Sequence, residues 1–192
     1  MQLDLRKYIA SIAVQIAEQV GSYDPAASYG PGECGAPIHR IVLGFQFYPH
    51  AWVALIFDTR PDADPVYDGE WQGFIEENLL DCDVDAWSDA AQAIIEDAAQ
   101  VTFRAVDGSI VTIGPHSHDD EEACEALFTQ LAGLFGDVVR EVLLASLRNN
   151  FFAMLPLASP CLARIDEHEC AYAWPDCDLR GTADDPGRIA AP

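Results

Sequence analysis

The amino-acid sequence predicts an α+β fold, a single domain in which helices pack on an antiparallel sheet. Residues 38–48 alternate between an apolar and a more polar face, and residues 52–57 are apolar throughout, which indicates two strands. Residues 3–20 place apolar side chains at helical spacing instead. The 192 residues, half of them hydrophobic, can bury one core without disulfides or a metal. We therefore expect one domain over residues 1–175 and a polar tail over residues 176–192.

The first third of the chain predicts a helix, a loop and a strand pair. The helix covers residues 3–20 and ends at Gly21, and residues 22–37 form a loop rich in Gly, Pro, Ser and Ala. In residues 38–48 one face carries Ile41, Leu43, Phe45 and Phe47. Residues 52–57 are apolar on both faces, as expected for a central strand. The two runs predict an antiparallel hairpin in the middle of the sheet.

The middle of the chain predicts two short helices and a second hairpin. Residues 71–80 are expected to form the first helix, and Asp85 or Ser88 to cap the second, which extends to about Ala99. Two β-branched runs, residues 101–106 and 110–113, flank Asp107 and Gly108. Asp-Gly between such runs is a strong local signal for a hairpin.

The last third predicts helices followed by a strand pair. Ser117 and Asp120 match a capping box, and Gly133 with Gly136 is expected to separate two helices, the second over residues 137–147. Residues 162–165 and 170–174 could form the last strands. The succession of helix, strand pair, helices, strand pair and helices is typical of an α+β domain.

The charge of the chain restricts its partners. The formal net charge is −22 and the isoelectric point is about 4.1, which disfavours binding to nucleic acids and to anionic membrane surfaces. Charged residues interrupt the apolar positions of residues 3–20, so we expect no signal peptide there and a cytoplasmic location. The six cysteines form no CxxC pair and are expected to be mostly reduced.

Several features invite a catalytic or metal-binding interpretation. His116, His118 and Asp119 or Asp120 could hold zinc or iron, although these residue types are also common in a solvated helix cap. Asp81, Asp83 and Asp85 form a DxDxD pattern, but the glycine and the glutamate of a calcium loop are missing. No nucleophile motif such as GxSxG is present. We therefore predict no enzyme activity and no cofactor, with a metal-dependent enzyme at the His116 cluster as the alternative and a structural adaptor domain as a further one.

Acidic and aromatic residues concentrate in residues 58–89, which hold eleven acids against one base, Arg60. Carboxylates steer a basic protein toward such a surface, and aromatic side chains supply anchors that lose their water on binding. The alternative is a solvated surface without a partner. The residues predicted to contact a basic protein are Asp58, Asp62, Asp64, Tyr67, Asp68, Glu70, Trp71, Asp81, Asp83, Asp85 and Trp87.

In type, the chain resembles the immunity proteins of bacterial polymorphic toxin systems, which are small acidic α+β domains without catalytic motifs. The local likeness is a strand pair ending at Asp58, followed by Asp68-Gly69-Glu70-Trp71. The resemblance implies a protein that binds and blocks a cognate toxin, often an enzyme with a basic cleft. It assigns no role to any single residue.

Overall fold

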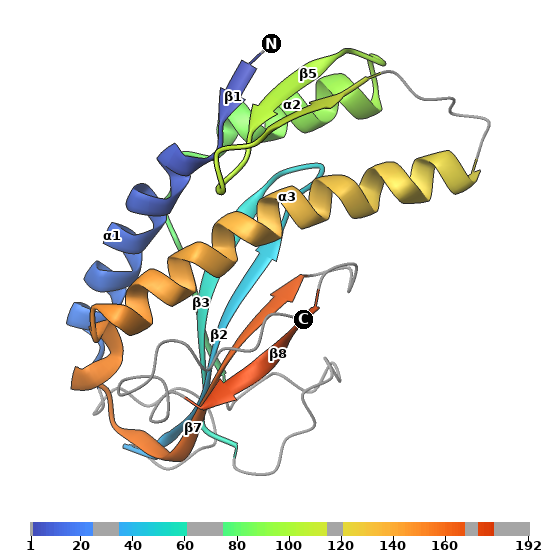
Figure 1. The fold of residues 1–192 in the computed structure, drawn as a ribbon. Helices are drawn as coiled ribbons and strands as arrows, with labels where there is room; N and C mark the ends of the chain where they lie inside the picture. The colour runs from blue at the N-terminus through green and yellow to red at the C-terminus, as the bar shows by residue number, and fades with distance from the viewer. Residues whose placement is uncertain (1, 25–34, 61–74, 115–120, 168–172, 179–192) are drawn as a thin grey trace.

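The computed structural model describes residues 2–24, 35–60, 75–114, 121–167 and 173–178, and in two of its strands, over residues 75–78 and 173–178, the backbone alone. Its helices and strands build one α+β domain with two sheets, which confirms the predicted fold class (Figure 1). Among the described residues, no helix combines the length and the apolar character needed to cross a membrane.

The larger sheet has five strands in the order β4-β3-β2-β7-β8. The predicted hairpin is confirmed at its centre: β2 (Ile38–Gln46) and β3 (Trp52–Asp58) pair antiparallel, with Leu43 opposite Leu55. The outer strands are β4 (Ile75–Leu79), β7 (Leu157–Glu167) and β8 (Ala173–Asp178). The pairing of β7 with β8 is antiparallel, as predicted, and β8 continues to Asp178, beyond the expected end of the domain at residue 175.

The smaller sheet has the order β1-β5-β6. The Asp107-Gly108 turn joins β5 (Val101–Arg104) to β6 (Ile110–Ile113) in the predicted antiparallel hairpin. The third strand, β1 (Gln2–Asp4), was expected to belong to a helix. It pairs parallel with β5, and the Leu5 N–H donates a hydrogen bond to the Arg104 carbonyl at 3.0 Å, so the helix begins only afterwards.

Neither sheet is purely antiparallel, which corrects the predicted topology. β2 pairs parallel with β7 in the larger sheet, as β1 does with β5 in the smaller one. In both cases the two strands are far apart in the sequence, and long connections with helices lie between them. Alternation of apolar residues reveals a strand but not the direction of a distant neighbour.

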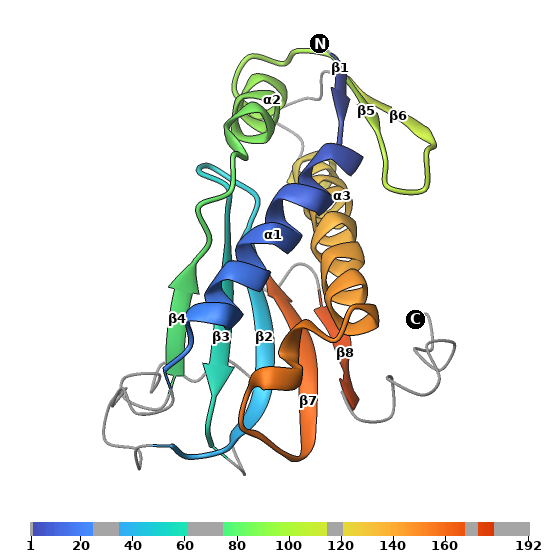
Figure 2. The same ribbon diagram turned by 90° about the vertical axis from the view of Figure 1, so that its left-hand side faces the viewer.

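Two helices cover one face of the larger sheet (Figure 2). These are α1 (Arg6–Ser22) and α3 (Glu121–Arg148), and a 3-10 helix, η1 (Phe151–Met154), follows α3. The predicted division of α3 at Gly133 and Gly136 is wrong, because the helix is continuous. Each glycine costs a helix about 1 kcal/mol relative to alanine. Burial of apolar residues on both sides, such as Leu131, Phe135 and Val139, outweighs that cost.

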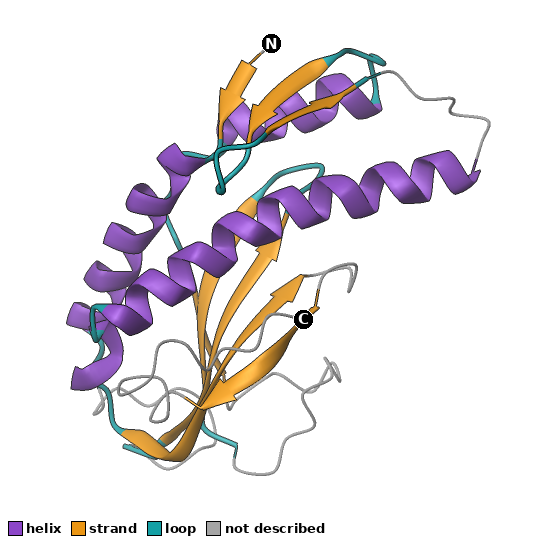
Figure 3. Ribbon diagram, viewed as in Figure 1, coloured by secondary structure: helices purple, strands orange, loops and turns teal. Residues whose placement is uncertain are grey.

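The third helix, α2 (Asp85–Ile95), lies against the smaller sheet (Figure 3). The predicted helix over residues 71–80 is wrong where the structure describes it, because β4 occupies its second half and pairs with β3. An unpaired edge of β3 offers backbone hydrogen bonds that a short helix would leave unused. One hydrophobic core connects the three helices with both sheets.

Candidate functional site

The structure describes five of the eleven residues predicted to contact a basic partner. The other six lie outside the described residues: Asp62, Asp64, Tyr67, Asp68, Glu70 and Trp71. The five fall into two groups. Asp81, Asp83 and Asp85 are exposed, whereas Asp58 and Trp87 are buried.

Trp87 is part of the core and cannot serve as a surface anchor in this structure. Its side chain is fully buried, and its ring lies 5.0 Å from that of Phe135 and 5.4 Å from that of Phe103. The indole N–H donates a hydrogen bond to the carbonyl of Phe47 at 2.9 Å, which satisfies its one polar atom. Trp87 therefore joins α2 to the β2–β3 turn, to β5 and to α3, and its role here is structural.

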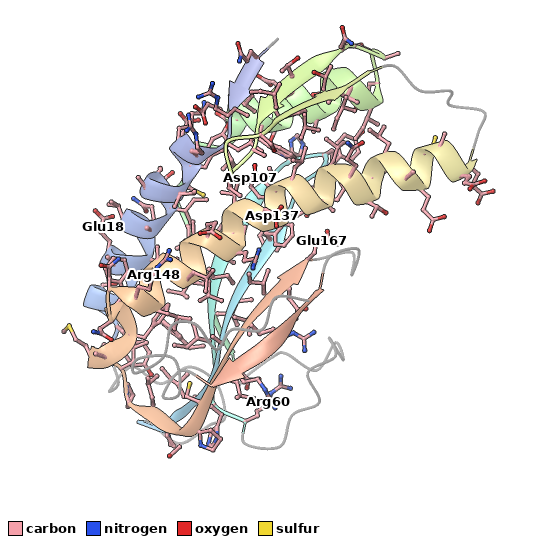
Figure 4. The ribbon with its side chains drawn as sticks, viewed as in Figure 1. Glu18, Arg60, Asp107, Asp137, Arg148 and Glu167 are labelled. Carbon is pink, nitrogen blue, oxygen red and sulfur yellow. The ribbon has the colours of Figure 1, made fainter. Side chains whose placement is uncertain are left out.

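Asp58 also lies away from the surface, at the end of β3, with only 6% of its side chain exposed. Its carboxylate accepts hydrogen bonds from Arg60 Nε at 3.0 Å and Nη2 at 3.2 Å, and it lies 3.4 Å from Arg40 Nη1. Figure 4 shows Arg60 at this end of the larger sheet. A buried carboxylate held by two guanidinium groups is a structural ion cluster, so Asp58 is not a partner contact here.

The three exposed acids belong to a longer surface of α2. In this helix Asp85, Asp89, Gln92 and Glu96 follow at helical spacing on one face, while Trp87, Ala90, Ala91, Ile94 and Ile95 fill the opposite, buried face. We define the acidic stripe as the exposed acids of this helix and its two flanks: Asp81, Asp83, Asp85, Asp89, Glu96 and Asp97. The sequence contains no Arg or Lys between residues 61 and 103, so no base from this part of the chain interrupts the stripe.

Hydrogen bonds to the turn between β2 and β3 hold α2 in place. Besides the bond from Trp87 to Phe47, the Ala51 N–H donates to Ser88 Oγ at 3.0 Å, and the Tyr48 hydroxyl donates to Glu96 Oε1 at 3.0 Å. Ser88 was predicted as a possible cap, but it lies inside the helix and serves this contact instead. The exposed face of α2 is thus presented by a helix fixed at both ends.

Two ionisable groups at the C-terminal end of the stripe have shifted pKa values. The hydrogen bond from Gln92 Nε2, at 2.9 Å, and then that from Tyr48 lower the pKa of Glu96. Burial, followed by the hydrogen bond to Glu96, raises the pKa of Tyr48. Near neutral pH the pair is therefore a neutral donor beside a charged carboxylate.

Tyr8, on α1, lies beneath the other end of the stripe. Burial, together with the negative charge of Asp83, raises the pKa of its hydroxyl to about 12, and Asp85 adds to the shift. The negative charges of the stripe thus act on a hydroxyl group inside the core.

The stability of α2 does not explain all the charges of the stripe. Asp85 suits the positive end of the helix dipole, but Glu96 and Asp97 lie at the negative end, where carboxylates are unfavourable. Asp85 and Asp89 are also four residues apart on the exposed face, a spacing at which like charges destabilise a helix. The helix dipole and the spacing of charges along α2 therefore do not account for Asp89 and Asp97.

Neither of the two candidate metal sites can be identified among the described residues. His116, His118, Asp119 and Asp120 lie outside the described residues. Within residues 2–24, 35–60, 75–114, 121–167 and 173–178, no three or more His, Cys, Asp or Glu side chains gather closely enough to hold a metal ion. That statement covers the DxDxD pattern, because Asp81, Asp83 and Asp85 are all described. Cys82, between the first two, is half-buried, and burial raises the pKa of its thiol.

Sequence reasoning missed four residues of this surface. Asp89 lies within residues 58–89 but is not among the eleven predicted contacts, and Tyr48, Glu96 and Asp97 fall outside that segment, where the acids are densest. The signal for Glu96 was present, because Asp85, Asp89, Gln92 and Glu96 repeat with the period of a helix. No signal pointed to Tyr48, which reaches Glu96 only through the packing of the β2–β3 turn on α2.

Comparisons with family models, with curated proteins and with solved structures find no significant match to this chain.

Proposed function

We propose that this protein binds a basic protein through the acidic stripe and thereby inhibits it. The observation that carries the proposal is the run of exposed acids on one fixed helix and its flanks, within a part of the sequence that contains no base. In the proposed role the protein is an immunity protein, and the partner is a cognate bacterial toxin with a basic cleft. The toxin is inferred from the resemblance of type, and the charge of the partner from the stripe.

Physical reasoning supports a partner over simple solubility. A small domain stays soluble with a net charge of roughly 2 to 8, far below the −22 of this chain. Acids that oppose the helix dipole and repel one another on α2 become favourable when a basic surface covers them. Because the hydrogen bonds to the β2–β3 turn already fix the helix, little conformational entropy is lost on binding.

Association kinetics test this proposal. The probes are purified basic bacterial toxin domains, tested one by one, with an unrelated basic protein as the comparison for non-specific attraction. We expect the triple variant Asp81→Asn, Asp83→Asn, Asp85→Asn to associate about tenfold more slowly at low salt, because charges near an interface mainly set the association rate. The salt dependence of association should flatten in the same variant.

A matched control separates the stripe from overall charge. Glu121, Glu122 and Glu125 are exposed at the start of α3, and their replacement by Gln also removes three negative charges. This control should associate almost as fast as the unchanged protein. If both triple variants slow association equally, or if no toxin domain binds better than the unrelated basic protein, the proposal is wrong. Circular dichroism of each variant excludes misfolding as the cause.

A further inference from the structure

Two aromatic side chains remain partly open to solvent beside the C-terminal end of α2. Tyr48 belongs to the turn between β2 and β3, which lies between α2 and α3 (Figure 1, Figure 2), and Phe128 belongs to α3. Their ring centroids are 5.7 Å apart, and the ring planes are perpendicular. Both side chains pack against the core but are only half-buried. The pair thus presents aromatic surface next to the last acids of the stripe.

Glu96, in the acidic stripe, holds its carboxylate beside Tyr48. Its Oε1 accepts a hydrogen bond from the Tyr48 hydroxyl at 3.0 Å, and its Oε2 accepts one from Gln92 Nε2 at 2.9 Å. Both donors are neutral, and among the described residues no base contacts Glu96, so its negative charge is not compensated. Each carboxylate oxygen can accept a second hydrogen bond. The exposed carboxylate is therefore fixed in position and still able to accept hydrogen bonds from a ligand.

A fixed carboxylate beside an aromatic ring favours a guanidinium group over other cations. A guanidinium is planar, so it can stack on an aromatic face while its N–H groups donate to both oxygens of one carboxylate. An ammonium group is a compact and strongly hydrated point charge without a plane to match the ring. A second copy of this chain, with its net charge of −22, would bring more negative charge to this end of the stripe and is disfavoured.

We propose that Tyr48 and Glu96 bind one arginine side chain of the basic partner, with Phe128 beside the aliphatic part of that side chain. The inference rests on the proposed function, because the stripe is what attracts a basic protein to this face. The two contacts differ in range: the exposed acids accelerate the encounter, whereas an aromatic anchor that loses its water slows dissociation. Tyr48 would supply the anchor that the sequence assigned to Trp87, which the core holds instead.

Two short peptides of equal charge test this site. One consists of six lysines, and the other of five lysines with one arginine at its centre. The stripe should attract both, but the arginine peptide should bind about two- to fivefold more tightly in fluorescence anisotropy at low salt, because only its guanidinium can stack on the ring. In NMR spectra the ring signals of Tyr48 should shift more with the arginine peptide than with the lysine peptide.

Four variants connect this preference to the proposed residues. Tyr48→Leu removes the ring, Glu96→Gln removes the charge of the carboxylate, and each should abolish the preference for arginine. Tyr48→Phe is the control for the first, because it loses the same hydroxyl but retains the ring. Asp97→Asn is the control for the second, because it removes one charge from the exposed neighbour of Glu96. Both controls should keep the preference.

The arginine site is wrong if the unchanged chain binds both peptides equally, or if a folded Tyr48→Leu or Glu96→Gln variant keeps the preference. Loss of the preference in Tyr48→Phe would contradict it as well, since the ring is still present. Circular dichroism shows whether each variant folds. If Tyr48→Leu does not fold, Glu96→Gln and Asp97→Asn decide, because both change exposed side chains.

The triple variant Asp81→Asn, Asp83→Asn, Asp85→Asn separates this inference from the proposed function. It should weaken the binding of both peptides alike, because it removes charge from the stripe without touching Tyr48 or Glu96. If it weakens neither, the stripe does not attract basic chains and the proposed function is wrong. If it weakens both but the unchanged chain shows no preference for arginine, the arginine site alone is contradicted.

Discussion

The acids of this chain occupy two contrasting environments. On the face of the larger sheet opposite α1 and α3, Asp58 lies between Arg40 and Arg60, and Asp166 accepts a hydrogen bond from Arg164 at 2.9 Å. Along α2 the acidic stripe faces water in a stretch of sequence without bases. The contrast follows from solvation, because a buried carboxylate needs a partner whereas an exposed one is stabilised by water. In these two regions the buried acids are held by guanidinium groups, whereas the acids of the stripe face water.

The largest expected difference between the two environments is in the free energy of unfolding that a single acid contributes. Asp58→Ala takes from Arg40 and Arg60 the carboxylate that both contact, and breaking such a buried pair costs roughly 3 kcal/mol of the free energy of unfolding. Asp81→Ala, in the stripe, should change it by less than about 0.5 kcal/mol. Urea denaturation of both variants measures the difference. Equal losses would show that the two environments do not differ in stability.

The pKa of Tyr8 provides a second comparison, because the hydroxyl is buried in the core and the negative charges of the stripe still raise its pKa. Its pKa is raised from 10.0 to about 12, so the folded state retains the proton over a range in which the unfolded chain has lost it. The corresponding stability is complete below the unfolded pKa and is lost as the pH rises toward the folded one. A shift of this size amounts to roughly 2 to 3 kcal/mol.

Tyr8→Phe removes this titration. Between pH 10.0 and about 12, the unchanged protein should lose stability more steeply than the variant in urea denaturation. Tyr48→Phe is the control for a hydroxyl near the surface, and it should leave more of the steep loss in place. If Tyr8→Phe and the unchanged protein show the same slope, the Tyr8 hydroxyl is not held in its neutral form by the core.

The smallest expected effect concerns repulsion within the stripe. Asp89→Asn removes a like charge one turn from Asp85, which should stabilise the protein by about 0.2 to 0.5 kcal/mol at low salt. Screening should abolish the gain at high salt. Melting temperatures at the two salt concentrations provide the test. A loss of stability at low salt would mean that Asp89 has a favourable contact that outweighs its repulsion from Asp85.

Much of the fold could be predicted because the signals were local. The alternation of residues 38–48, the apolar run of residues 52–57 and the Asp107-Gly108 turn each predicted a strand pair that the structure confirms. The errors came from competition between local signals and distant partners. Residues 75–79 became β4 because β3 offered an edge, and α3 stayed continuous across its glycines because its apolar face is buried.

The candidate site was predicted only in part. The sequence gives the number and spacing of the acids but not the environment of each one in the fold. Asp81, Asp83 and Asp85 lie on the surface as expected, but Asp58 and Trp87 were drawn into the interior by Arg40, Arg60 and the core. Composition cannot separate a carboxylate that faces water from one that faces a guanidinium at the next strand. That distinction depends on register, which is set by contacts between segments that are remote in the chain.

The sequence by itself determined the fold class, the central hairpin and the excess of negative charge, since these depend on the period of apolar residues and on composition. Only the tertiary structure decided the parallel pairs β1–β5 and β2–β7 and the packing of Tyr48 against Glu96. The physical reason is the distance along the chain over which each interaction acts. Helical and strand periodicity act between near neighbours, whereas strand direction, burial of a charge and exposure of an edge depend on which distant segments meet in the folded chain.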